Sequence, residues 1–146
     1  MAFINRIINA ITQLHPLHPM TVHFPIGLTA AGALFVLLAL ITRRKTFEQA
    51  AFFNIIFAAA TSVLASATGM RSNLINYDGA APNGTLKVIL GVALLVILVA
   101  AILMRRRNPE ILWGKSSGAL YAAAYFASFA IALVLGFLGG VILDGF

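Results

Sequence analysis

The three histidines of this chain lie within nine residues, at His15, His18 and His23. Imidazole is a common ligand of haem iron and zinc, and it is the side chain that exchanges protons near neutral pH. The chain has no cysteine, which excludes disulfides, thiolate metal sites and covalently attached c-type haem. Any imidazole chemistry must therefore occur at one position, where the first long apolar stretch begins.

His18 and His23 are the candidates for binding haem b or a quinone. A haem with two histidine ligands needs imidazoles on opposite sides of the macrocycle, usually from different helices. These two histidines lie five residues apart on one segment, and Pro19 and Pro25 interrupt its helical hydrogen bonds. No histidine follows His23. One protomer alone is therefore a poor haem site, and we expect no cofactor.

A metal ion held by all three histidines is geometrically conceivable, because the prolines would allow an irregular loop that turns the imidazoles inward. No carboxylate lies in that stretch, and we expect no metal.

The hypothesis we favour is a structural motif formed by the histidines and prolines. Its imidazoles would hydrogen-bond Asp78, Asp144 or backbone carbonyls that the prolines leave free, because lipid offers polar groups no partner. His23 is nearer the apolar core than His15, so its loss should cost more stability. The motif consists of His15, Pro16, His18, Pro19, His23, Pro25 and Gly27.

The composition of the chain is that of a membrane protein. Of its 146 residues, 61% are hydrophobic and only 14 are charged, and the mean hydropathy is +0.97. A hydrocarbon core of about 30 Å is crossed by about 20 helical residues. Four stretches are long enough, at about 25–42, 51–70, 86–104 and 119–143. We therefore predict an all-α, polytopic membrane protein, with a four-transmembrane-helix bundle over residues 15–146.

A separate amphipathic helix is predicted over residues 1–14, before the bundle. Its apolar residues recur at three- and four-residue spacing, and polar residues fill the other face. Beside a membrane domain, such a helix lies flat in the interface. The apolar positions are Phe3, Ile4, Ile7, Ile8, Ile11 and Leu14.

Basic residues are distributed unequally between the predicted loops. Seven follow the first span or separate the third from the fourth, namely Arg43, Arg44, Lys45, Arg105, Arg106, Arg107 and Lys115. The other side has three, Arg6, Arg71 and Lys87. The excess marks the cytoplasmic side. Both termini would then face the periplasm of a bacterial inner membrane, and the net charge of +6 needs no nucleic-acid partner.

Little else in the chain could do chemistry. Glu48 and Glu110 lie beside the basic clusters at the cytoplasmic edge, where solvation or lipid headgroups would account for them. Residues 71–85 form the only long predicted loop, with turn signals at Asp78-Gly79 and Asn83-Gly84. The sequence offers no nucleophile–base pair, no glycine-rich phosphate loop and no paired carboxylates. We expect no catalytic residues and no enzyme activity.

Small residues recur every four positions along the fourth predicted span. Such a ladder lets another helix approach closely. It consists of Ala124, Ser128, Ala132, Gly136 and Gly140. A shorter ladder on the second span consists of Ala58, Ser62 and Ser66. One ladder would serve the bundle, and the other could serve a partner.

The segment from His15 to Leu28, His-Pro-Leu-His-Pro-Met-Thr-Val-His-Phe-Pro-Ile-Gly-Leu, resembles the signature HPLHPMxVHFPIGL of a bacterial domain-of-unknown-function family of small four-helix integral membrane proteins. Weaker similarity lies at 67–70 and 135–140. The resemblance implies a four-helix membrane fold in settings suggestive of respiratory electron transfer, where haem binding is a reasonable expectation. The family often has another histidine near the start of its third helix. This sequence has Lys87 there, which counts against haem.

Together these observations predict a non-catalytic accessory subunit of a larger bacterial membrane complex, in respiratory or photosynthetic electron transfer. Its partners would be the lipid bilayer and other membrane-protein subunits. The alternative is a b-type haem or quinone-binding electron-transfer protein that uses His18 and His23.

Overall fold

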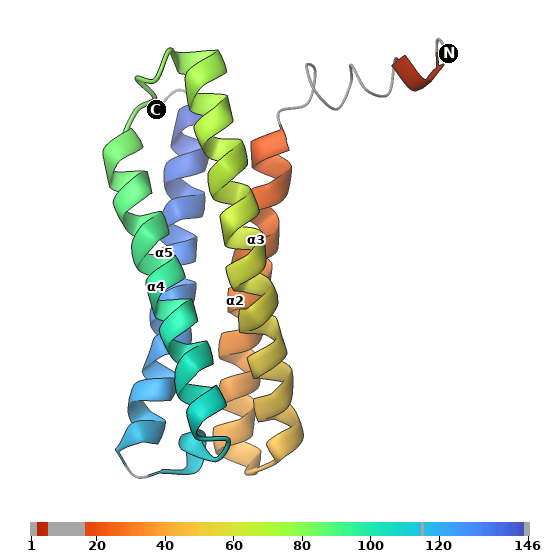
Figure 1. Cartoon of the computed structure of the whole chain (residues 1–146), viewed down its shortest axis with the longest axis vertical. Helices are drawn as coiled ribbons and strands as arrows, with labels where there is room; N and C mark the ends of the chain where they lie inside the picture. The colour runs from red at the N-terminus through yellow and green to blue at the C-terminus, as the bar shows by residue number, and fades with distance from the viewer. Residues whose placement is uncertain (1–2, 6–16, 115, 145–146) are drawn as a thin grey trace.

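A computed structural model describes residues 3–5, 17–114 and 116–144. Most of the predicted helix over 1–14 lies outside these residues, as do His15 and Pro16. Four long helices stand side by side (Figure 1): α2 over Leu17–Thr42, α3 over Lys45–Tyr77, α4 over Gly84–Arg107 and α5 over Ser117–Asp144. A 3-10 turn, η2, covers Ile111–Trp113 between α4 and α5.

The four helices run alternately up and down the bundle, and each packs on its neighbours in chain order, with α5 closing the ring against α2 (Figure 1). The largest interface is that between α2 and α3. All four are long and apolar enough to cross a membrane. The prediction of an all-α membrane protein with four spans is therefore confirmed.

Small residues let these helices approach closely. Most buried positions of α2 and α3 are Ala, Gly, Ser or Thr. Gly32 of α2 faces Ile55 and Tyr125 across the core, where an added Cβ would lie 3.4 Å from each side chain. The larger buried side chains fill the remaining space. The core cluster consists of Val36, Ala39, Ala51, Ile55, Ala58, Leu94, Leu98, Ala101, Ile111, Leu112, Tyr121, Ala122, Tyr125 and Ala132.

The helices α2 and α3 end where single residues adopt the left-handed conformation. Arg43 has φ +57° and its N–H donates to the Ala39 carbonyl at 2.8 Å, so α2 turns into α3 within two residues. Asp78 has φ +49° and Gly79 φ +82°, and both N–H groups donate to the carbonyl of Asn73, which closes α3. This capping arrangement satisfies carbonyls that a helix end leaves free.

The predicted loop over 71–85 is wrong in its first half. Residues 71–77 continue α3 for two further turns, and only 78–83 connect α3 to α4. The predicted span ends at residue 70 because the side chains that follow are polar. Polar residues can continue a helix, so the helix extends beyond the apolar stretch. The Asn73 side chain also braces the connection, because its Oδ1 accepts the N–H of Ala81 at 2.9 Å and its Nδ2 donates to the Gly79 carbonyl at 3.3 Å.

Candidate functional site

His18 lies in the first turn of α2 and its ring packs against α3. Its Nδ1 is 3.3 Å from Oγ1 of Thr68, which is itself 2.8 Å from Oγ1 of Thr21. A Cβ on Gly69 would lie 2.8 Å from the imidazole Cε1. Gly69 therefore leaves the space that the half-buried ring occupies. The side-chain partner of His18 among the described residues is therefore a threonine hydroxyl.

His23 lies on the opposite side of α2, because five residues correspond to about 140° around a helix. Its side chain is exposed, and Nδ1 lies 2.5 Å from the carbonyl oxygen of Pro19, one turn earlier. This carbonyl is not one that a proline leaves free. Because a carbonyl can only accept, Nδ1 carries the hydrogen, and Nε2 of the neutral ring is an acceptor. His23 therefore does not face the core of the bundle. The predicted order of His23 and His15 is not tested, because His15 lies outside the described residues.

The remainder of the motif is divided between the two faces of α2. Pro25 is buried inside the continuous helix, and its carbonyl accepts the hydroxyl of Thr29 at 2.7 Å. Ile26 packs against Gly136 of α5. Phe24 is 61% exposed, and no described atom lies within 4 Å of a Cβ added at Gly27. The prolines therefore do not create the irregular loop that a three-histidine metal site would need within the described part of α2.

The small-residue ladder of α5 faces the bundle along its middle. Ser128 and Ala132 are each 1% exposed, and Ala124 is partly buried in the core. A Cβ on Gly136 would lie 2.9 Å from Cδ1 of Ile26, whereas Gly140 has no described atom within 4 Å of such a Cβ. The hydroxyls of Ser62 and Ser128 are buried and lack a hydrogen-bond partner in the described residues. Ser66, the last member of the shorter ladder, is exposed.

A second polar cluster, which the sequence analysis missed, lies at the other end of the bundle. Glu48 in the first turn of α3 is 3% exposed. Its two carboxylate oxygens accept Nε and Nη2 of Arg105 from α4, at 2.5 and 3.0 Å. This two-pronged geometry is the strongest that an arginine and a carboxylate adopt. The expectation that solvent or lipid headgroups account for Glu48 is wrong.

Two buried tyrosines of α5 extend this cluster into the core. The hydroxyl of Tyr121 donates to Glu48 Oε1 at 3.4 Å and lies 2.7 Å from the hydroxyl of Tyr125. The rings meet edge to face, with centroids 5.1 Å apart. The Arg105 guanidinium also lies 5.1 Å above the ring of Phe52. Three helices are thus joined by one hydrogen-bonded set, which we call the Glu48 cluster (Glu48, Arg105, Tyr121 and Tyr125).

The sequence does carry a signal for this cluster. Tyr121 and Tyr125 are spaced one helical turn apart on the face that also carries Ser128 and Ala132, so their hydroxyls require partners inside the bundle. Glu48 is a carboxylate that lies within one helical turn of the start of the predicted span 51–70. A search for an acceptor for the tyrosine hydroxyls would therefore have paired Tyr121 with Glu48.

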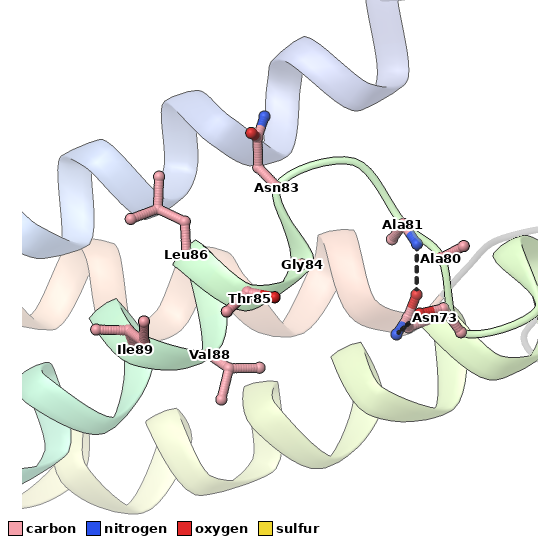
Figure 2. Close-up of a pocket in the computed structure, with 10 residues that line it drawn as sticks. Asn73, Ala80, Ala81, Asn83, Gly84, Thr85, Leu86, Val88 and Ile89 are labelled. Carbon is pink, nitrogen blue, oxygen red and sulfur yellow. Dashed lines mark hydrogen bonds between the residues drawn. The ribbon is translucent and has the colours of Figure 1, made fainter.

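Figure 2 shows an open hollow of about 750 Å³ beside the α3–α4 connection. The Asn73 side chain, the turn at Ala80–Gly84 and the first turns of α4 line it. None of its lining residues is ionisable. The hollow therefore offers neither a general acid or base nor a charged ligand contact.

The described residues contain no group of three or more His, Cys, Asp or Glu side chains that could hold a metal ion. Two polar clusters join helices of the bundle through side-chain hydrogen bonds. Thr68 and Glu48 lie twenty residues apart on α3, which corresponds to about 30 Å. The His18–Thr68 contact and the Glu48 cluster therefore lie near opposite edges of a hydrocarbon layer.

A family model described as "Predicted membrane protein (DUF2231)" matches residues 14–143. No curated protein and no solved structure matches the chain.

Proposed function

The chain belongs to the DUF2231 family of predicted membrane proteins, and we propose that it is a non-catalytic accessory subunit of a larger bacterial membrane complex. The proposal rests mainly on the outward face of α2. There a polar His23 and an open Gly27 lie one turn apart on the exposed side of a helix in an apolar environment.

Contacts between transmembrane helices are enriched in these two kinds of residue. A small residue lets a second backbone come close, and a polar side chain can hydrogen-bond across the contact. Nε2 of His23 is an acceptor that its own bundle does not use in the described residues. A donor on a neighbouring transmembrane helix would complete it, which is how an accessory subunit would dock.

The finer assignment concerns which complex is involved. Residues 15–28 resemble the signature of a family that occurs in settings suggestive of electron transfer. From this resemblance we infer that the complex acts in respiratory or photosynthetic electron transfer. From the seven basic residues against three, we infer that the end carrying Arg105–Arg107 faces the cytoplasm of a bacterial inner membrane.

Site-directed photo-cross-linking in the native membrane tests the docking face. A photoreactive residue at Gly27 should give one discrete product with a subunit of different mass, whereas the same residue at Val96, which is 61% exposed on α4, should not. His23→Ala should weaken the product at position 27. A product of twice the protomer mass would identify a homo-oligomer instead, and equal diffuse labelling at both positions would contradict the proposal.

The hydrogen bond of His23 supports a second candidate function, binding of haem b. Histidines that ligate metals usually donate their other ring nitrogen to a carbonyl or carboxylate, as Nδ1 does here to Pro19. His18 faces α3, so His18 and His23 do not fit one haem within a protomer. The acceptor Nε2 fits an iron ion or a quinol hydroxyl, and it does not fit a quinone carbonyl.

A reduced-minus-oxidised visible spectrum of the purified protein separates the two functions. The accessory-subunit proposal expects no Soret or α-band. A near-stoichiometric haem spectrum that disappears in His23→Ala and persists in His18→Ala would replace it with the haem function.

A further inference from the structure

The end of the bundle formed by residues 42–48 and 105–117, which we call the arginine-rich end, carries more basic charge than its own acids balance. It contains seven Arg or Lys residues and two Glu residues, a net charge of +5. Both carboxylates are already engaged, Glu48 with Arg105 and Glu110 with Lys45 at 2.6 Å. The other acids of the chain, Asp78 and Asp144, lie towards the opposite end.

Four arginines are therefore without a carboxylate of their own at this end. Arg43 and Arg44 form the α2–α3 turn, and Arg106 and Arg107 end α4. All four side chains are exposed. Because the apolar helices end here, these guanidinium groups lie at the depth of the lipid headgroups.

Arg43 is held in an unusual way. It has φ +57°, a conformation that glycine or asparagine adopts at lower cost than arginine. Its guanidinium lies 5.8 Å from the centre of the Trp113 ring of η2. Tryptophan is typical of membrane interfaces. The stacking fixes the position of a cation at headgroup depth and connects the α2–α3 turn to the α4–α5 connection.

We propose that the arginine-rich end binds the phosphate headgroup of an anionic phospholipid, with Arg43 and Arg44 as its main contacts. Guanidinium groups match phosphate oxygens in shape and charge. Arg106 and Arg107 add to the positive potential around the site. The strained backbone of Arg43 is then explained, because asparagine at this position would relieve the strain and remove the contact to the phosphate.

Lipid competition tests the proposal on the full chain. The protein is purified in a neutral detergent with equal amounts of phosphatidylglycerol and phosphatidylcholine, and the retained lipid is quantified by mass spectrometry. We expect wild type to retain mainly phosphatidylglycerol. Removing interfacial arginines should lower the preference by about fivefold each, so Arg43→Asn with Arg44→Gln should nearly abolish it.

Arg71→Gln is the matched control, because it removes an exposed arginine from the far end of α3. It should leave the preference unchanged. Asparagine accepts the backbone of position 43, so the melting temperature of Arg43→Asn in neutral detergent should equal or exceed that of wild type. The lipid effect is thereby separated from misfolding.

Three outcomes would overturn the proposal. The first is a wild type without preference for the anionic lipid. The second is an equal loss of preference in Arg71→Gln, which would indicate general electrostatic attraction. The third is stabilisation by inorganic phosphate that matches stabilisation by the lipid, because that would identify a site for a soluble anion.

Discussion

The pair formed by Glu48 and Arg105 is the interaction in this protein that is most sensitive to change. Their side chains are 4% and 16% exposed. A charged group removed from water requires a partner and further hydrogen bonds. Arg105 supplies two hydrogen bonds to the carboxylate, and Tyr121 supplies a third. These hydrogen bonds satisfy the carboxylate. Removing either Glu48 or Arg105 would leave the other charged group without its partner.

Glu48→Gln should therefore destabilise the protein by about 3–5 kcal/mol, measured as the free energy of unfolding in detergent. Glu110→Gln is the control, because its ion pair with Lys45 is exposed and is worth about 0–1 kcal/mol. The double variant Glu48→Leu/Arg105→Met should be less destabilised than either single variant. Similar losses in Glu48→Gln and Glu110→Gln would show that the carboxylate does not depend on Arg105.

The two described histidines should differ in their contribution to stability, with His18 contributing more than His23. His18→Ala removes the contact to Thr68 and leaves a space against Gly69, so we expect a loss of about 1–3 kcal/mol. His23→Ala removes a contact within one turn of an exposed face and should change stability by less than about 0.5 kcal/mol. Thermal unfolding of both variants checks this order, and a larger loss in His23→Ala would refute it.

The sequence could indicate where chemistry was available but not which side each side chain faces. The histidine window was visible from residue type alone. Whether His18 or His23 points inward depends on the rotation of α2, which is fixed by packing of Gly32 and Ile26 on other helices. Glu48 was misjudged for a similar reason, since its partners lie 57 and 73 residues later in the chain.

At the scale of single helices, hydropathy was sufficient to find all four but not to bound them. Each predicted span lies within a described helix over the residues that the structure gives. The helix α3 continues past Met70, because a chain leaves the helical conformation at Asp78-Gly79, where φ becomes positive, and not where its residues become polar. Turn residues were therefore better boundary markers than the end of the apolar window.

The ladder on α5 predicts a specific packing defect. Gly136→Leu should lower stability by about 1–2 kcal/mol, because Ile26 occupies the space that the new side chain needs. Gly91→Leu on α4 is the control, since no described atom lies within 4 Å of a Cβ there. Both changes replace glycine by a better helix former, so their difference in unfolding free energy isolates the contact. Equal losses of unfolding free energy in the two variants would show that Gly136 does not form a close contact with α2.

For the molecule as a whole, the two polar clusters and the basic residues define two unlike ends. The His18–Thr68 contact lies at one end with the α3–α4 connection, and the Glu48 cluster lies at the other with the arginines. The bundle therefore has two chemically different ends.

We expect the arginine-rich end to be cytoplasmic, because basic loops are retained on that side. A reporter that is active only in the cytoplasm should be silent when fused after Phe146 and active when inserted at Pro109. The reverse pattern would invert the topology. Replacing Arg106 and Arg107 by glutamine should weaken the orientation, since it removes two of the seven basic residues.

The unequal lengths of α3 and α4 bear on the thickness of the bilayer around the protein. Between Glu48 and Arg71, α3 has 22 uncharged residues, about 33 Å of helix, whereas between Lys87 and Arg105 its neighbour α4 has 17, about 26 Å. A flat membrane matches both stretches only if the Lys87 side chain reaches outwards to the interface. Otherwise α3 tilts or the lipid beside α4 thins, each at a cost of fractions of a kcal/mol per ångström. The protein should therefore deform the membrane asymmetrically. Its free energy of unfolding in a bilayer should then depend on the chain length of the lipid.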